Sequence, residues 1–302
     1  MLLISSKRFQ EHTTPPGHPE RPERAMVFDR VAAAFRDRGG RVIEPRPATR
    51  DELLRVHDAA YVDAIDAVEG RAAMLDADTF TSPESVEVAR LAAGAAVQAA
   101  EHALDTGETA FALVRPPGHH AERGTAMGFC LFNNIAVAAA AAVARGLERV
   151  AVVDIDVHHG NGTQWMFYGD PRVFYVSTHQ FPFYPGTGAA DETGTGAGQG
   201  FTLNIPLAAG ARDGDYEQAY ATIAAALDRY APQLLLVSAG YDAHAEDPLA
   251  SMRVTTGGYA EIVRTLVSAA RRTGCPLALV TEGGYDLDAL AACLEATLTE
   301  LV

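Results

Sequence analysis

Lysine is almost absent from this chain, because Lys7 is the only one among 302 residues. The body of the chain therefore offers no amine for Schiff-base catalysis and no lysine for a phosphate-binding P-loop. Positive charge is also scarce: 24 Lys and Arg residues face 39 Asp and Glu residues, which leaves a formal net charge of −15. Such an acidic chain repels nucleic acid and favours cationic partners, so we expect no DNA or RNA ligand.

Cysteine is the next scarce residue. Cys130, Cys275 and Cys293 are widely separated and form neither a CxxC motif nor the dense framework of a secreted scaffold. The first residues, MLLISSKRF, carry too few apolar side chains for the central stretch of a signal peptide. Together these features predict a reduced, cytoplasmic protein.

Long hydrophobic runs are missing as well. Residues 124–144 carry no charge, but Asn133 and Asn134 interrupt them and their apolar side chains are mostly alanine. We therefore expect a buried helix there and no contact with a membrane. With 48% hydrophobic and 21% charged residues, the composition is that of a globular protein. No repeat or linker divides residues 1–302, so we predict a single domain.

Apolar segments typical of buried strands alternate with segments typical of helices. The expected strands are residues 109–114, 149–156, 172–178, 201–206, 233–239 and 276–282. The expected helices are residues 82–104, 133–147, 215–230 and 258–272, the first with a capping box at its start, whereas residues 1–80 have more loop character. The alternation predicts an α/β fold with a mostly parallel central sheet, helices on both faces, and a site in loops at the carboxyl ends of the strands.

Polar side chains follow four of the expected strands. The segments that carry them are RPPGHHA (115–121), DIDVHHGNGT (154–163), SAGYDAHAEDP (238–248) and EGGYDL (282–287). A single Asp or His at a strand end is usually a cap or a core residue. Here the four loops hold five of the ten histidines, and parallel strands end at one edge of a sheet, so we expect the side chains to converge.

Asp156, His158 and Asp242 are the expected metal ligands. Asp156 and His158 are two residues apart, so their side chains share a face of an extended segment. Asp242 follows another strand and can supply a third ligand. Two carboxylates and one imidazole suit a divalent ion and leave a coordination position open, as catalytic zinc requires. The pattern predicts one zinc ion per chain.

Two histidines and a tyrosine complete the predicted site. Catalysis by zinc needs a proton acceptor, for which His119 and His120 are available, and a donor to an oxyanion, for which Tyr285 is available. A carboxylate raises the pKa of a histidine that it orients, whereas an amide does not. Our hypothesis is that Asp154 holds His119 as a cation. In the same hypothesis Asn161 holds His120, which stays neutral and acts as the general base.

These motifs together resemble the zinc-dependent histone deacetylase family of the arginase–deacetylase superfamily. The resemblance runs from HPERPER (18–24) to EGGYDL (282–287) and includes GFCLFNN (128–134) and FYPGTG (183–188) in family order. It implies an arginase-like fold and a deacetylase. It also implies the same zinc ligands, tandem histidines and transition-state tyrosine that the residues themselves indicate.

Further sites are implied by the resemblance alone. A structural potassium ion near the zinc would be bound by Asp154, Asp156, His158, Ser177 and Thr178. A second potassium ion would lie near Phe167, Asp170 and Val173. The family's acyl-lysine channel would have Phe129 and Tyr184 as walls, although both could be ordinary core aromatics. Other implied substrate contacts are Gly128, Leu249, Gly283 and Gly284.

Departures from the family pattern indicate a subtype. Gly118, before the histidines, and Asn161, where class I enzymes have aspartate, both resemble class II enzymes and their bacterial relatives. In some class II members a histidine at the position of Tyr285 nearly abolishes activity on acetyl-lysine, so the tyrosine implies an active enzyme. His244 replaces a small residue, either as a rim contact or as a solvent-facing side chain. The manganese pair of ureohydrolases would need carboxylates near Gly160 and His244, and neither position has one.

The expected function is removal of acetyl or other acyl groups from amines, with acetyl-lysine or a related small N-acetylated amine as the substrate. Leu249 is similar to the residue of lysine-type class II members, whereas polyamine-selective relatives tend to have glutamate there. Hydrolysis of acetylpolyamines is the first alternative, and non-catalytic binding of acylated ligands is the second. The sequence is compatible with an oligomer.

Overall fold

The computed structural model describes all 302 residues, arranged around one large sheet. The sheet has eight strands in the order β2-β1-β5-β10-β9-β6-β7-β8, and each neighbouring pair is parallel. Its strands are β1 (Leu2–Ile4), β2 (Arg41–Ile43), β5 (Ala110–Ala112), β6 (Val150–Asp154), β7 (Val173–Gln180), β8 (Thr202–Leu207), β9 (Leu234–Ala239) and β10 (Leu277–Thr281). The prediction of an α/β fold with a mostly parallel sheet is confirmed.

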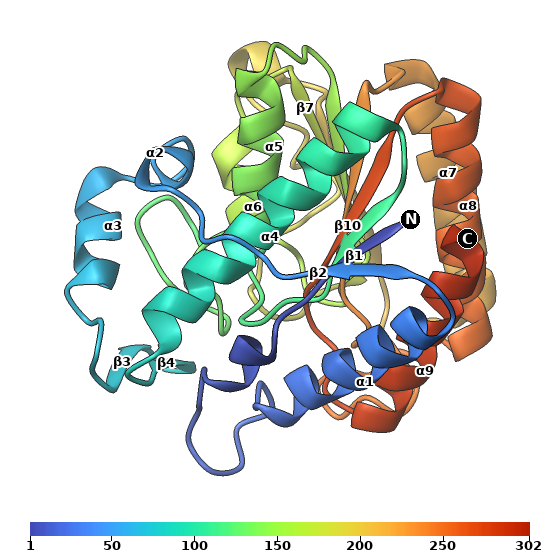
Figure 1. Cartoon of the computed structure of the whole chain (residues 1–302). Helices are drawn as coiled ribbons and strands as arrows, with labels where there is room; N and C mark the ends of the chain where they lie inside the picture. The colour runs from blue at the N-terminus through green and yellow to red at the C-terminus, as the bar shows by residue number, and fades with distance from the viewer.

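Helices cover both faces of this sheet (Figure 1). The helices on one face are α4 (Ser85–Thr106) and α5 (Asn134–Ala144), and those on the other are α1 (Glu23–Asp37), α7 (Asp213–Tyr230), α8 (Thr256–Thr273) and α9 (Leu287–Leu301). The shorter helical elements are α2 (Arg50–Leu53), α3 (Ala59–Asp66), α6 (Asn161–Phe167) and the 3-10 turns η1 (Lys7–Gln10) and η2 (Gly196–Gly198). A separate antiparallel hairpin consists of β3 (Ala73–Asp76) and β4 (Thr79–Thr81).

The central strands are apolar throughout because both of their faces are buried. In β6, Val150 and Val152 belong to the core beneath α4 and α5, whereas Ala151 and Val153 belong to the core beneath α7 and α8. Side chains of a strand alternate between the two faces, so a sheet covered on both sides needs apolar residues at successive positions. The two cores contain 45 and 42 buried residues, so neither face is exposed.

Each expected strand and helix overlaps an observed element, but the predicted start of α4 is wrong. The helix begins at Ser85, and Glu84 at its N-cap makes no side-chain cap. Ser82 does not form a capping box, because its hydroxyl lies 2.9 Å from the Ser85 hydroxyl and donates to the Glu11 carbonyl. The Ser85 hydroxyl accepts a hydrogen bond from the Ser82 N–H at 2.6 Å, so only one half of the reciprocal capping pair is present.

Residues 1–80 contain more regular structure than the sequence predicts. The strands β1 and β2 have three residues each, which is too short for an alternation to be visible. The amphipathic pattern of α1 is weakened by Arg24, a charged residue that is fully buried. The uncharged segment 124–144 forms a loop followed by α5, which is buried as expected. Among the helices, none joins sufficient length to sufficient hydrophobicity for a membrane span.

Candidate active site

Four adjacent strands end at the same place. In the sheet β5 lies next to β10, β10 next to β9, and β9 next to β6. His119 follows β5, Tyr285 follows β10, Asp242 follows β9 and Asp156 follows β6. Because all four strands are parallel, their carboxyl ends share one edge, and the loops beyond them build a single site.

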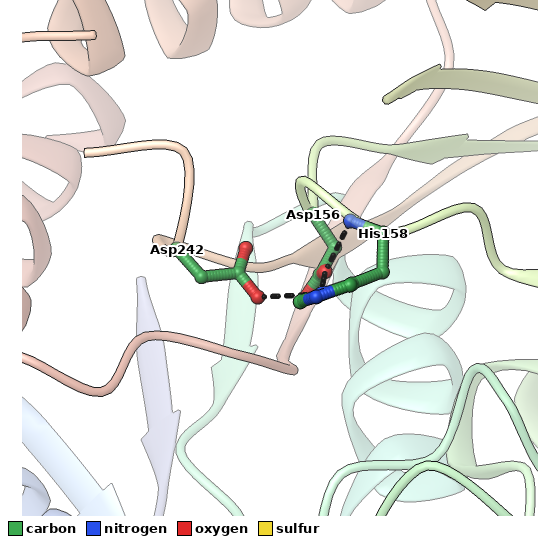
Figure 2. Close-up of side chains that lie close together, drawn as sticks. All are labelled: Asp156, His158 and Asp242. Atoms are coloured by element: carbon green, nitrogen blue, oxygen red, sulfur yellow. Dashed lines mark hydrogen bonds and ion pairs between the residues drawn. The ribbon is translucent and has the colours of Figure 1, made fainter. Parts of the chain in front are cut away.

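Asp156, His158 and Asp242 form a group that could hold a metal ion, with one ligand atom from each residue within 4.8 Å of the others. His158 Nδ1 lies 3.1 Å from Asp156 Oδ1 and 3.1 Å from Asp242 Oδ2. Figure 2 shows the three side chains pointing toward one another from two different loops. All three residues are buried. Two carboxylates facing one imidazole are a donor set that divalent zinc accepts.

Backbone groups orient the two carboxylates toward that shared point. The Gly283 N–H donates to Asp156 Oδ2 at 2.8 Å, and the Val157 N–H donates to Asp242 Oδ1 at 2.8 Å. Burial and the nearby Asp156 charge raise the pKa of Asp242 to about 7. Two anionic groups held together in a buried site repel each other, so a cation between them would lower their energy. The residues present therefore fit a divalent metal.

Residue 283 must be glycine because its backbone lies against the carboxylates of Asp156 and Asp242. A Cβ atom there would lie 2.2 Å from Asp242 Oδ2 and 2.6 Å from Asp156 Oδ2. Both contacts are shorter than real Cβ atoms allow, so any side chain would displace the carboxylates. Gly284, which follows, has a φ of +121°, a conformation that residues with a Cβ rarely adopt.

His119 and Asp154 form a buried ion pair beside the metal-ligand group. His119 Nδ1 lies 2.9 Å from Asp154 Oδ2, and the Tyr175 hydroxyl donates to the same oxygen at 3.2 Å. Burial lowers the pKa of His119, but the charges of Asp154 and Asp156 outweigh that effect and raise the pKa well above its usual value. His119 is therefore held as a cation.

His120 has a different partner and the opposite shift. Its Nδ1 lies 2.8 Å from Asn161 Oδ1, at the first residue of α6. Burial and the neighbouring His119 charge lower the pKa of His120 well below its usual value. The ring packs against Gly128, where a Cβ atom would lie 2.3 Å from it. His120 is therefore neutral, with its Nε2 not engaged by Asn161.

Tyr285 reaches the site from the loop after β10. Its backbone N–H donates to Asp247 Oδ2 at 2.6 Å, and the Arg24 guanidinium lies 5.0 Å from its ring centroid. The Phe129 and Tyr285 rings form a T-shaped pair at a centroid distance of 5.8 Å. Burial raises the pKa of Tyr285 well above its usual value, so the hydroxyl keeps its proton and can donate it in a hydrogen bond.

Aromatic rings line the approach to the metal-ligand group. Tyr184 is 37% exposed, and its ring centroid lies 5.1 Å from that of His120, so it is a surface wall of the site and not a core residue. The Phe183 ring stacks on the His158 ring at a centroid distance of 5.4 Å, a contact that the sequence does not predict. Leu249 and Tyr285 line one side of a cavity of about 480 Å³ whose other side is the 14–23 loop.

Comparison with known proteins shows the family to which this fold belongs. Residues 18–301 match the family model described as the histone deacetylase domain. The chain belongs to the histone deacetylase family. This family contains deacetylases and amidohydrolases, and the arginase-like fold predicted from the sequence is confirmed by a crystal structure of the HDA15 HD domain, with a TM-score of 0.92 and 37% identity. That match covers 99% of this chain and 88% of the other.

Similar proteins occur in archaea and bacteria. A probable deacetylase of Archaeoglobus fulgidus is 40% identical over 293 residues, which cover 95% of this chain and 81% of that protein. A histone deacetylase-like amidohydrolase of Pseudomonas aeruginosa is 44% identical over 263 residues, which cover 84% of this chain and 69% of that protein.

The residues expected at potassium sites of this deacetylase fold lie around β7. Asp154 pairs with Ser177 in the register of β6 and β7, and the Ser177 hydroxyl lies 2.8 Å from His179 Nδ1. The Thr178 hydroxyl contacts the Tyr220 hydroxyl at 3.3 Å. The other three residues lie between α6 and β7 or at their ends: Phe167, Asp170 and Val173. The Asp170 carboxylate is paired with Arg172 at 2.7 Å.

Two buried charged residues of this deacetylase site were missed in the sequence. Glu282 accepts hydrogen bonds from the Gly118 N–H at 2.6 Å and the His119 N–H at 3.1 Å, and burial raises its pKa to about 7. Arg24 donates to the carbonyls of Gly284 at 2.7 Å and Glu282 at 2.5 Å. The sequence did contain a signal for both residues. A glutamate at the end of an apolar strand and an arginine on the apolar face of a helix are each expected to be buried beside a polar partner.

His244 has a local role. Its Nε2 lies 3.2 Å from the Thr256 hydroxyl, and its Nδ1 accepts a hydrogen bond from the Glu246 N–H at 3.2 Å. These contacts tie the loop that carries Asp242 to the start of α8. Neither a rim contact nor a freely solvated side chain is therefore needed to account for it.

Proposed function

We propose that this protein is a zinc-dependent amidohydrolase that removes acetyl or other acyl groups from amines. The observation that carries the proposal is the convergence of three metal-ligand atoms within 4.8 Å, next to a histidine cation and a neutral histidine, with the buried Tyr285 in the loop after the adjacent strand β10. Each part matches a need of amide hydrolysis: an electrophile, a base and a donor to the oxyanion.

Zinc would be held by Asp156, His158 and Asp242. When bound, it supplies a Lewis acid that polarises the amide carbonyl and lowers the pKa of adjacent water to about 7. The protein groups around it are already oriented by backbone hydrogen bonds, so little rearrangement is needed to receive the ion. A site of three protein ligands leaves coordination positions for water and substrate.

His120 is the proposed general base. With its Nδ1–H donated to Asn161, the second ring nitrogen is the acceptor for a proton from the attacking water. As water adds to the amide carbon, His120 becomes a cation. The same nitrogen then delivers the proton to the departing amine as the carbon–nitrogen bond breaks, so the catalyst returns to its starting state.

His119 and Tyr285 are proposed to stabilise the charge that develops on the substrate oxygen. His119 is kept cationic by Asp154 and acts through its electric field, not by transferring a proton. The Tyr285 hydroxyl would donate a hydrogen bond to the tetrahedral oxyanion. Because the site is buried, both interactions act in a medium of low dielectric constant and are stronger than in water.

The proposed substrate is acetyl-lysine or a related small N-acetylated amine. Phe129 and Tyr184 would enclose the methylene groups of its arm, and Gly128 leaves room between wall and base. Leu249 stands beside Tyr285 where a carboxylate would favour a polyamine. Gly283 and Gly284 would lie under the acyl group.

Several further features are proposed with this function. Residues 1–302 would form a single catalytic domain, and the protein would act in the cytoplasm. Structural potassium would bind at Asp154, Asp156, His158, Ser177 and Thr178, and near Phe167, Asp170 and Val173. The support for the potassium sites is family resemblance, together with the proximity of these residues around β7.

Metal analysis combined with a substrate panel tests the proposal. The purified protein is analysed for zinc and assayed with acetyl-lysine peptides, acetylputrescine and acetylspermidine. We expect one zinc ion per chain and the highest kcat/KM on an acetyl-lysine peptide. Bound zinc without hydrolysis of any substrate would favour a binding protein, and a preference for the acetylated polyamines would favour the polyamine alternative. A chain that takes up no zinc would contradict the proposal.

A further inference from the structure

The hydrogen bond that holds His120 continues to a second partner. Asn161 Oδ1 faces His120 Nδ1 at 2.8 Å, and Asn161 Nδ2 donates to Glu122 Oε1 at 2.7 Å. The base proposed above is therefore joined through one amide group to a half-buried carboxylate. Glu122 lies only two residues after His120, yet it acts on the far nitrogen of Asn161 and not on the ring itself.

Asn161 needs such a partner because its two ends have opposite hydrogen-bonding characters. The amide oxygen accepts and the amide nitrogen donates, and a half turn of the side chain exchanges them without a change in shape. With the oxygen toward His120, the ring must carry its proton on Nδ1, which leaves Nε2 as a proton acceptor. With the nitrogen toward His120, Nδ1 must accept, the proton moves to Nε2, and the ring loses its function as a base.

Glu122 resolves this ambiguity. A carboxylate only accepts hydrogen bonds, so it attracts the Asn161 nitrogen and repels the Asn161 oxygen. Two weaker acceptors lie on the same side of Asn161 Nδ2, namely Met127 Sδ at 3.4 Å and the His120 carbonyl at 3.5 Å. All three groups favour the same orientation, and the charged one favours it most strongly.

We propose that Glu122 is a positioning residue that sets the proton-accepting tautomer of His120 through the side-chain amide of Asn161. The consequence for catalysis rests on the function proposed above, whereas the tautomer itself does not. An aspartate in place of Asn161 would accept with either oxygen and would set the same tautomer unaided. The amide needs Glu122 because half of it is a donor.

The backbone around Glu122 is anchored in a way that suits this role. Its N–H donates to the Thr125 carbonyl at 2.9 Å, and its carbonyl accepts a hydrogen bond from His57 Nδ1 at 3.0 Å. His57 Nε2 in turn accepts from the Asn133 N–H at 3.0 Å. The backbone that carries the Glu122 side chain is thus anchored through both its N–H and its carbonyl.

The first experiment reads the tautomer directly. Protein labelled with ¹⁵N-histidine and loaded with zinc is studied by NMR, in which protonated and unprotonated ring nitrogens have well-separated shifts, and His120 is assigned from His120→Gln. Wild type is expected to carry the proton on Nδ1. Glu122→Met, of similar length but with only a weak thioether acceptor in place of the carboxylate, is expected to shift population to Nε2–H, whereas Glu69→Met, an exposed charge-matched control, is not. An unchanged Nδ1–H signal in Glu122→Met overturns the proposal.

The second experiment separates positioning from simple structural damage. Glu122→Met is introduced into wild type and into Asn161→Asp, and kcat/KM is measured on an acetyl-lysine peptide. We expect a loss of about tenfold beside Asn161, a part of the 10²–10⁴ that a general base contributes. Beside aspartate, which sets the tautomer without help and carries the same charge as Glu122, we expect no loss. Equal losses in both backgrounds would overturn the proposal. If wild type itself is inactive but the tautomer shift occurs, the proposed function fails and the positioning role stands.

Discussion

His119 and His120 are neighbours in sequence with ring centroids 4.1 Å apart, yet they bind partners of opposite kinds. One ring faces the carboxylate of Asp154 and the other faces the amide of Asn161. The first pKa is raised and the second is lowered, and the charge of the first helps to lower the second. A single pair of adjacent residues is thereby divided into a cation and a neutral base.

This division predicts unequal effects of substitution. Asp154→Asn removes the carboxylate that raises the pKa of His119, so this ring should lose its proton at a lower pH. The basic limb of the kcat/KM profile should then move to lower pH, and a shift in the opposite direction would contradict the assignment.

The two histidines should also differ in how much their removal costs. His120→Ala should lower kcat by about 10²-fold or more, as expected for the loss of a general base, and His119→Ala should lower kcat less. Equal losses with equally shifted profiles would remove the distinction.

Tyr285→Phe should lower kcat by about 10²–10³ because one donor to the oxyanion is lost. The fold should be unaffected, since the ring contacts of Tyr285 with Arg24 and Phe129 remain available to phenylalanine. Turnover of an acetyl-lysine peptide is the measurement, and Tyr168→Phe, at a partly exposed tyrosine that ends α6, is the matched control. Turnover at the wild-type level in Tyr285→Phe would exclude this role.

Gly283→Ala should lower the zinc content of the purified protein. The added methyl group would collide with the carboxylates of both Asp242 and Asp156, which must then move apart. Zinc measured per chain after dialysis is the readout, and Gly214→Ala is the control because a Cβ there meets no atom within 4 Å. Full zinc occupancy in Gly283→Ala would contradict the view that these carboxylates bind the ion.

Glu20→Gln should destabilise the fold strongly. Glu20 is fully buried and bridges Arg24 at 3.0 Å and Arg115 at 2.7 Å, so its loss leaves two buried guanidinium groups without a counter-charge. Breaking a buried ion pair in this way costs about 3–5 kcal/mol. Urea unfolding measures the cost, with the exposed Glu23→Gln as control. A change in the free energy of unfolding below about 1 kcal/mol would show that Glu20 does not neutralise the two guanidinium groups.

His57 should make the protein sensitive to mild acid. Burial lowers its pKa to about 4, below the value of about 6.5 in an unfolded chain, so between these pH values the unfolded state binds more protons. The free energy of unfolding should fall by roughly 3 kcal/mol as the pH drops through this window, and His57 should add no further loss below it. His57→Gln should flatten that part of the stability curve, whereas His102→Gln on α4 should not. An unchanged curve in His57→Gln would contradict the prediction.

Much of this site could be predicted because its residues lie in short segments with a local meaning. Asp156 and His158 share a face by their spacing, and the strand before them is recognisable from its apolar run. A parallel sheet then brings Asp242 and Tyr285 to the same edge whatever the details of packing. The start of α4 could not be predicted in this way, because the Ser82 hydroxyl bonds to the Glu11 carbonyl of the N-terminal loop and to the Ser85 hydroxyl, and not to a backbone N–H of the helix.

The sequence by itself determined the type of sheet, the edge at which the site forms and the chemical kinds of its side chains, since these follow from residue spacing and strand order. Only the tertiary structure decided how those side chains are held. The Glu282 carboxylate meets backbone groups of His119, Arg24 meets the Gly284 carbonyl, and Phe183 covers His158. Such contacts depend on how loops from distant parts of the chain pack against one another. The spacing of residues within one segment carries no information about the distances between such loops. The orientation of a single amide between His120 and Glu122 is decided at the same level.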